Sequence, residues 1–193
     1  MTLALPLLCV LAGGKSSRMD GVDKALVTIS GRRMIDIVIE RFQLKAGTII
    51  ISGSEDRGTD LTTIPDDPKG PVGPAAALWS VSRWLRLSGE AIDGFFTVPV
   101  DAPFLPSDLL SRLLVDNRST VAADQSGIHP TIGYWQLTAL NEAFQQLADR
   151  PNPALRAIAS ACQSEHVFFD PSVLTNINSV ADVKAAESRG RLS

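Results

Sequence analysis

Apolar and polar positions along this chain follow two patterns that alternate. Three short runs are continuously apolar or β-branched, as expected of strands buried on both faces; they cover residues 7–11, 48–51 and 95–100. Between the runs, apolar residues recur every three or four positions, which predicts helices that bury one face. The recurring residues are Ile35, Ile39 and Phe42 after the first run, and Leu78, Val81 and Leu85 after the second.

The second half of the chain continues this alternation. Ser107 is expected to cap a helix that begins near Leu109. Ser179, with Asp182 three residues later, resembles a capping box that starts a closing helix. Further strands are predicted at residues 120–123, 132–135 and 167–169, and further helices at residues 138–147 and 154–161.

Strands that alternate with helices at this spacing predict an α/β fold. The expected architecture is a mostly parallel sheet between two layers of helices. No repeat, low-complexity tract or linker interrupts residues 1–193, so we expect one domain. In such a sheet, ligands bind at the carboxyl ends of the strands.

Composition and charge narrow the class of protein. Hydrophobic residues make up 45% of the chain and charged residues 20%, which is typical of a globular protein. The formal net charge of -3 gives no reason to expect binding to nucleic acid or to an anionic membrane. The apolar run ending at Leu11 is too short for a membrane-spanning helix and lacks a basic segment, so we expect a cytoplasmic protein. Cys9 and Cys162 stand alone in apolar stretches and are expected to be buried thiols.

A glycine turn with three cations follows the first predicted strand. Gly13 and Gly14 end the apolar run, and the cations Lys15, Arg18 and Lys24 come next. Backbone N–H groups beside glycine can approach phosphate oxygens without a Cβ in the way, and the cations can neutralise a triphosphate. The pattern fits neither a Walker A loop nor a dinucleotide fingerprint, because each of these needs a further glycine. The segment is therefore a candidate phosphate-binding loop.

Asp101 follows the third apolar run. A carboxylate at the end of a parallel strand faces the edge where ligands bind. Mg²⁺ commonly uses one or two protein carboxylates together with phosphates and water. We therefore expect Asp101 to bind Mg²⁺ beside a nucleoside triphosphate; the alternative is a structural turn residue before Pro103.

Five segments match, in order, the sequence signatures of one enzyme family. They are L-A-G-G-K-S-S-R-M-D-G-V-D-K at residues 11–24, G-P-V-G at 70–73, V-D-A-P-F-L-P at 100–106, H-P-T-I at 129–132 and N-I-N-S at 176–179. Together they resemble the molybdenum cofactor guanylyltransferases, the MobA family, over nearly the whole chain. The resemblance implies a Rossmann-like nucleotidyltransferase fold. It also implies transfer of GMP from GTP to molybdopterin with release of pyrophosphate.

The resemblance further implies roles for individual residues around the nucleotide. Lys24 and Arg18 would stabilise the transition state, and Asp101 would bind Mg²⁺. Ser52 falls where the family has an Asn that contacts the nucleotide, and Asp66 falls where it has an Asp near the guanine, although Asp67 is one residue away. The remaining nucleotide-binding candidates belong to the first turn: Leu11, Ala12, Gly13, Gly14 and Lys15.

The chain also departs from the family pattern. Asp20 stands where the family usually has Gly and places a negative charge beside the phosphate loop. Gly13 favours guanine, because the related cytidylyltransferases carry L-A-A-G at this point. Two alternatives stay open: a related nucleotidyltransferase that uses CTP or another acceptor, and a catalytically impaired GTP-binding homologue. The other replacements are Ser52 for Asn, Val100 for Cys, Ala102 for Thr and Gly73-Pro74 for Ala-Gly.

Three further polar residues are candidates for the acceptor or a second metal contact. His129 could shape the acceptor pocket or be a structural loop histidine. Asn176 and Asn178 could complete the Mg²⁺ or pterin-phosphate site through their side-chain carbonyls, or simply favour a turn. Proteins that synthesise or accept the molybdenum cofactor are possible transient partners. The three tryptophans are assigned to core packing: Trp79, Trp84 and Trp135.

Overall fold

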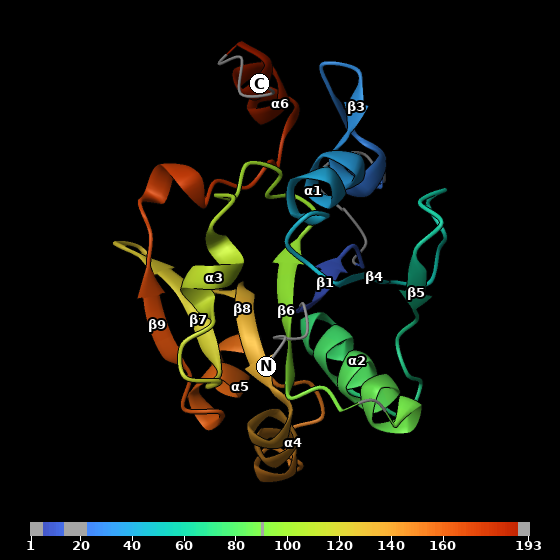
Figure 1. The fold of residues 1–193 in the computed structure, drawn as a ribbon, viewed down its shortest axis with the longest axis vertical. Helices are drawn as coiled ribbons and strands as arrows, with labels where there is room; N and C mark the ends of the chain where they lie inside the picture. Colours follow the sequence, from blue (N-terminus) through green and yellow to red (C-terminus); the bar gives the residue numbers. More distant parts are fainter. Residues whose placement is uncertain (1–5, 14–22, 90, 189–193) are drawn as a thin grey trace.

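A seven-stranded sheet forms the centre of the molecule (Figure 1). The computed structural model describes residues 6–13, 23–89 and 91–188. The strands lie in the order β5-β4-β1-β6-β8-β7-β9. Their bounds are Leu7–Leu11 (β1), Thr48–Ser52 (β4), Thr62–Ile64 (β5), Gly94–Pro99 (β6), Thr120–Asp124 (β7), Gly127–Gln136 (β8) and Glu165–Phe168 (β9). A separate two-stranded ribbon consists of Thr28–Ile29 (β2) and Arg32–Arg33 (β3).

Most neighbouring strands run parallel, as the sequence predicted. β1 lies between β4 and β6 and pairs with both in parallel. β5 is parallel to β4, and β9 is parallel to β7. The exception is β8, which is antiparallel to both of its neighbours, β6 and β7. The parallel strands β5, β4, β1 and β6 therefore direct their carboxyl ends toward the same edge.

Helices cover both faces of the sheet, which completes the predicted three-layer α/β architecture. Successive residues of β1 alternate between two cores: Leu8 and Val10 pack with α1 and α3, whereas Leu7 and Cys9 pack with α2, α4 and α5. The helix bounds are Met34–Phe42 (α1), Pro74–Ser88 (α2), Leu109–Leu113 (α3), Leu137–Gln146 (α4), Leu155–Ala161 (α5) and Val180–Ser188 (α6). Two short 3-10 helices cover Lys24–Leu26 (η1) and Pro171–Val173 (η2).

A third, smaller hydrophobic cluster joins the ribbon, α1 and α6. Its buried members are Ile29, Met34, Ile37, Ile177 and Ala186. The ribbon and α6 lie at the end of the molecule toward which β6 points (Figure 1). The cluster therefore holds the last helix close to the carboxyl edge of the sheet.

The structure differs from the sequence prediction in several details, among them the β2–β3 ribbon, which was not predicted. The edge strand β5 was not predicted, because its three residues are too few for a periodic pattern. β8 begins at Gly127, well before the predicted start at residue 132, because its polar first half pairs with β7. Ser107 does not cap α3: the N-cap position is Asp108, and the N–H of Leu109 donates to the Pro106 carbonyl in a turn before the helix. β9 begins at Glu165, before the predicted residue 167.

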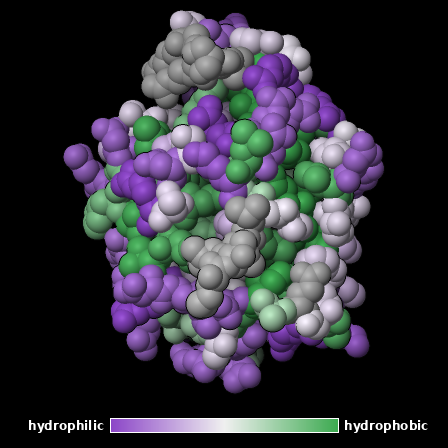
Figure 2. All heavy atoms as spheres, viewed as in Figure 1, coloured by the Kyte–Doolittle hydropathy of each residue, from purple (hydrophilic) through white to green (hydrophobic). Residues whose placement is uncertain are grey.

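The predicted core residues are confirmed. Trp135 is fully buried, and Trp79 and Trp84 pack against the same core as Leu7 and Cys9. Cys9 and Cys162 are free and buried, and burial raises the pKa of each thiol to about 12. On the face shown in Figure 2, polar side chains predominate at the two ends and apolar atoms appear across the middle. No helix in the described part of the chain is long and apolar enough to cross a membrane.

Thr97→Val tests the only hydrogen bond made by the Trp135 indole among the described residues. The indole Nε1 donates to Thr97 Oγ1 at 2.9 Å inside the core. Valine would leave this buried N–H without an acceptor, so the free energy of unfolding should fall by about 1–3 kcal/mol. Thr97→Ser keeps the hydroxyl and should lose only about 1 kcal/mol, for one methyl group. Urea unfolding followed by tryptophan fluorescence measures both; equal losses would contradict this role for the hydrogen bond.

Candidate active site

The candidate site begins where three adjacent parallel strands end. Leu11 is in register with Ser52 of β4 and with Pro99 of β6. Two backbone hydrogen bonds extend this alignment: the Ala12 N–H donates to the Ser52 carbonyl, and the Val100 N–H donates to the Leu11 carbonyl, each at 3.1 Å. The turn after β1 and the acid after β6 therefore lie at the same edge of the sheet, as predicted.

Lys24, Asp101 and Asn178 meet at this edge although they are far apart in the sequence. Lys24 Nζ lies 2.9 Å from Asp101 Oδ2 and 2.7 Å from Asn178 Oδ1. The lysine and aspartate side chains are 22% and 18% exposed, so solvent reaches both. The Ile177 N–H donates to the Asp101 carbonyl at 2.7 Å, which fixes the strand end against the segment before α6. A cation, a carboxylate and an amide oxygen thus converge at one accessible point.

The position of Lys24 depends on a cap. Lys24 opens η1, and the Asp23 carboxylate accepts a hydrogen bond at 2.9 Å from the Ala25 N–H. This bond satisfies a free donor at the start of the helix and fixes the direction in which the helix begins. Asp23 therefore helps to position the backbone of Lys24, from which its side chain extends.

The position of Asn178 depends on a second cap. Asp182 Oδ2 accepts hydrogen bonds from the N–H groups of Asn178 and Ser179, at 2.9 and 2.8 Å, and the Asp182 N–H donates to Ser179 Oγ. The predicted capping box is thus confirmed. The hydrogen bond from the Asn178 N–H lowers the pKa of Asp182 most, followed by the bond from the Ser179 hydroxyl, and the Ser179 N–H and the Lys24 charge add to the effect.

Arg57 contacts residues that flank the site, and no motif in the sequence points to it. Its guanidinium donates to Asp23 Oδ2 at 2.7 Å, to the Ala12 carbonyl at 3.1 Å and to the Glu55 carbonyl at 2.9 Å. The side chain is only 8% exposed. An arginine in a polar stretch after a strand resembles any solvated loop residue, so no pattern in the sequence distinguishes it.

The oxygen atoms around Lys24 are of the kind that Mg²⁺ prefers. Asp101 supplies a carboxylate and Asn178 an amide oxygen, and Asn176 precedes Asn178 by two residues on the segment bonded to the Asp101 backbone. Asn176 Oδ1 is buried without a hydrogen-bond partner among the described residues. Among all the described residues, there is no group of three or more His, Cys, Asp or Glu residues that could hold a metal ion. The donor set thus fits a hard cation that takes its remaining ligands from phosphate and water.

Asp66 and Asp67 differ in their surroundings. Asp67 is held in place, because its carboxylate lies 2.9 Å from Arg83 Nε and accepts a bond from the Lys69 N–H. Asp66 has no such partner within the described residues, and partial burial raises the pKa of its carboxyl group. Asp66 is therefore the one whose carboxylate is available to a ligand.

His129 lies inside β8, not at its start as predicted. Its Nε2 lies 2.9 Å from Asp124 Oδ2 on the neighbouring strand β7. The pKa of Asp124 is lowered, mainly by the hydrogen bond from the Ser126 hydroxyl and in smaller part by His129. The contact provides a structural reason for His129, and a role in acceptor binding stays a prediction.

Residues 14–22 of the glycine-rich segment lie outside the described residues. The expectations for Gly14, Lys15, Arg18 and Asp20 fall on this stretch. Within the described part, Gly13 lies beside Ser52 and Gly53, and a Cβ at position 13 would meet no atom closer than 3.8 Å. Space alone therefore does not require glycine at position 13.

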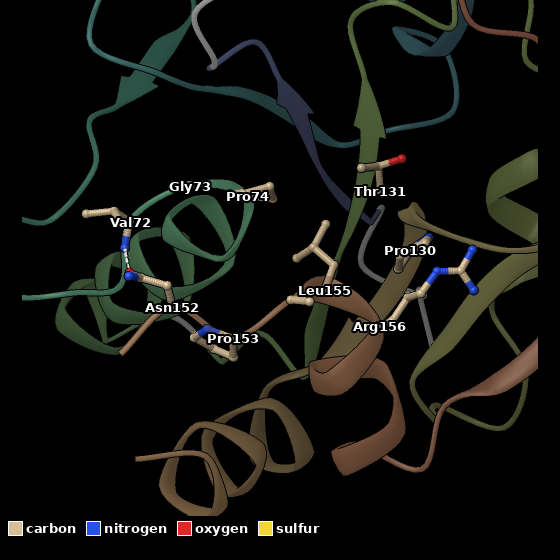
Figure 3. A pocket seen from close by; sticks show the side chains of 10 residues that line it. Val72, Gly73, Pro74, Pro130, Thr131, Asn152, Pro153, Leu155 and Arg156 are labelled. Carbon is tan, nitrogen blue, oxygen red and sulfur yellow. Dashed lines mark hydrogen bonds between the residues drawn. The ribbon is translucent and has the colours of Figure 1, made fainter. Parts of the chain in front are cut away.

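A cavity of about 580 Å³ opens near the amino end of α2 (Figure 3). Pro130 and Thr131, in its wall, belong to the irregular stretch of β8 where the pairing with β7 shifts. The Val72 N–H donates to Asn152 Oδ1 across one side at 2.9 Å. The lining is largely apolar with a few polar groups; it consists of Val72, Gly73, Pro74, Pro130, Thr131, Asn152, Pro153, Ala154, Leu155 and Arg156.

A parallel α/β sheet with a lysine, an aspartate and an amide oxygen at its carboxyl edge defines an enzyme class that handles phosphorylated ligands. Residues 8–170 match the model of one family, the MobA-like NTP transferase domain. The chain belongs to this family, and it is a nucleotidyltransferase.

Similar proteins extend over nearly the whole chain. The molybdenum cofactor guanylyltransferase of Cereibacter sphaeroides is 31% identical over 93% of this chain and 94% of its own length. That of Acidiphilium cryptum is 32% identical over 93% and 92%. In fold, the chain resembles the molybdopterin-guanine dinucleotide biosynthesis protein A of Archaeoglobus fulgidus, with a TM-score of 0.73 at 18% identity over 95% of this chain and 98% of that one.

Asp182→Ala tests the cap that positions Asn178. Because the pKa of Asp182 is lowered in the folded protein, the charged form contributes stability above the ordinary carboxyl pKa, and this contribution is lost as the pH falls through the folded pKa. At about pH 7, the substitution should lower the free energy of opening α6 by about 1 kcal/mol. Below about pH 4, the difference in this free energy between the variant and the unmodified protein should shrink.

Hydrogen exchange of the α6 amides measures this free energy. Lys184→Ala, at an exposed position of the same helix, is the matched control and should leave the exchange unchanged. A gap that stays constant from neutral to acidic pH would show that the Asp182 charge does not stabilise the helix.

Proposed function

We propose that this protein transfers GMP from GTP to molybdopterin, forming the guanine dinucleotide cofactor and releasing pyrophosphate. One observation carries the proposal: in a member of the MobA-like family, Lys24 and Asp101 meet 2.9 Å apart at the edge where β1, β4 and β6 end. Two relatives that cover nearly the whole chain are named molybdenum cofactor guanylyltransferases, which supports guanine and molybdopterin as substrates.

In this proposal the end of the sheet binds the nucleotide. The backbone of Leu11, Ala12 and Gly13 contacts guanine and ribose, and Ser52 borders the same edge from β4. Asp66, whose raised pKa reflects partial burial, accepts a hydrogen bond from the guanine edge. Gly14 and Lys15 directly follow Gly13 in the sequence and are assigned to nucleotide binding on that basis.

The reaction is an in-line displacement at phosphorus. A phosphate oxygen of the acceptor attacks the α-phosphorus of GTP, the bond from the α-phosphorus to the bridging oxygen breaks, and pyrophosphate leaves with that electron pair. Lys24 stabilises the negative charge that develops on the phosphate oxygens. Arg18 is assigned the same role on the basis of its position in the sequence. The attacking phosphate is already ionised at neutral pH, so no general base is needed.

Asp101, Asn176 and Asn178 would hold Mg²⁺. When bound there, Mg²⁺ neutralises phosphate charge and orients the triphosphate. Lys24 donates to both Asp101 and Asn178, so the lysine contacts the oxygen atoms that would hold the metal. The lysine side chain can turn from these oxygens to a phosphate without moving its backbone.

The cavity beside α2 is the proposed acceptor site. Its apolar walls suit a flat heterocycle, and Thr131, Asn152 and Arg156 supply the few polar groups that fix orientation. Thr131 lies on β8, which neighbours β6 in the sheet, and Asp101 follows the end of β6 by two residues. An acceptor bound here would direct its phosphate toward this edge. The polar surface and net charge of -3 fit a cytoplasmic enzyme that meets its molybdopterin donor and acceptor proteins only transiently.

Asp101→Ala tests the metal assignment. Pyrophosphate release from GTP in the presence of Mg²⁺ and molybdopterin should fall by at least about a hundredfold. The melting temperature should change little, because the pair with Lys24 is partly solvated and such pairs contribute at most about 1 kcal/mol. Asp149→Ala, at an exposed carboxylate after α4, is the control and should keep the full rate. Near-full activity of the Asp101 variant would refute the metal role.

A comparison of nucleotides tests the choice of substrate. With molybdopterin and Mg²⁺ present, GTP should release pyrophosphate faster than CTP or ATP at equal concentration. A faster reaction with CTP would assign the protein to the cytidylyl branch. GTP binding without pyrophosphate release from any nucleotide would identify a catalytically impaired homologue.

A further inference from the structure

Arg57 is a charged residue with a nearly buried side chain that the proposed reaction does not use. It lies in the loop between β4 and β5, and its side chain is 8% exposed. A buried guanidinium is costly unless its donors are satisfied. Three acceptors meet this need: the Asp23 carboxylate and the carbonyls of Ala12 and Glu55.

Two of these acceptors belong to the nucleotide site. Ala12 directly follows β1. Its N–H donates to the Ser52 carbonyl, and its own carbonyl accepts a hydrogen bond from Arg57. Asp23 caps η1 through one carboxylate oxygen and pairs with Arg57 through the other. A single planar guanidinium therefore bridges the residue that follows β1 and the residue that precedes Lys24.

The bridge fixes two points that flank residues 14–22. Gly53 allows the guanidinium to approach, since a Cβ there would lie 3.3 Å from the Arg57 side chain and the φ of Gly53 is 146°. Arg57 thereby determines both where the chain leaves β1 and where it enters η1. Charge-assisted hydrogen bonds of a planar guanidinium are directional. Loss of the Arg57 guanidinium would therefore release Ala12 and Asp23 together.

We propose that Arg57 is a positioning residue of the nucleotidyl-transfer site, which sets the Ala12–Gly13 backbone for the nucleotide and the start of η1 for Lys24. The inference rests on the proposed function only in naming GTP as the ligand. Arg57 acts through Ala12 and Asp23, because three of its five N–H donors are engaged and only 8% of the side chain is exposed. Its removal should therefore weaken binding of GTP more than binding of the acceptor.

Arg57→Ala tests this role in the full-length protein. The Kd for Mg²⁺·GTP, measured with a fluorescent GTP analogue in the absence of turnover, should rise about tenfold, the effect of losing a buried charged hydrogen bond. In the complete reaction the KM for GTP should rise in parallel, while the KM for molybdopterin should stay unchanged. Millimolar guanidinium should restore part of the affinity, and Arg57→Lys should lie between the variant and the unmodified protein, because an ammonium cannot span both acceptors.

Arg33→Ala is the matched control. Arg33 pairs with Asp36 and donates to the carbonyls of Arg57 and Gly58, so it supports the same loop but contacts neither Ala12 nor Asp23. Its loss should leave the Kd for GTP within about twofold, as is usual for a partly exposed ion pair.

Three results would overturn the inference. The first is an Arg57→Ala protein that binds GTP as the unmodified protein does. The second is an equal loss in Arg33→Ala, and the third is a fall in kcat alone with both KM values unchanged, which indicates a smaller folded fraction. Failure of the proposed function would look different: the unmodified protein would bind GTP and release no pyrophosphate, and the Kd comparison would still decide the role of Arg57.

Discussion

The parallel pairing of β1 with both β4 and β6 is the constraint on which this structure depends. It places Leu11 level with Ser52 and Pro99, and so brings three chain segments to one edge. The backbone hydrogen bonds continue one residue past the strands, from Ala12 to Ser52 and from Val100 to Leu11. The candidate site is an extension of this ladder: its first turn and its carboxylate are fixed by the same interactions that fix the sheet, and ligand binding needs no separate scaffold.

Around this rigid edge, the polar side chains are held by a second set of interactions that is local and charged. Asp23 caps η1 and thereby orients Lys24, whereas Asp182 caps α6 and thereby orients Asn178. The two capped segments meet at the Lys24–Asn178 hydrogen bond. Helix capping thus supports the site as well as stability, because each cap also sets the position of one partner in the Lys24–Asn178 hydrogen bond.

The sequence was sufficient for the parts of the fold that bury apolar side chains in a regular pattern. The run at residues 7–11 and the spacing of Ile35, Ile39 and Phe42 predicted β1 and α1 correctly. β5 and the first half of β8 were missed, because backbone pairing with a neighbour defines them and their side chains carry no periodic signal. At the site, the turn after β1 and Asp101 could be predicted to meet because parallel strands share an edge. The contacts of Arg57 could not, since they join loops distant in sequence whose spacing contains no pattern.

The small cluster under α6 has a consequence for how the molecule responds to heat. Asn178 is anchored by the cap of α6 and by Ile177 in a cluster of five buried residues, separate from the two larger cores of the sheet. A unit with so few buried contacts opens at a lower free energy than the sheet does. Warming would then detach the last helix and carry the amide away from the lysine while the strands remain paired. Thermal inactivation of this protein would be a local and reversible event that precedes melting of the domain.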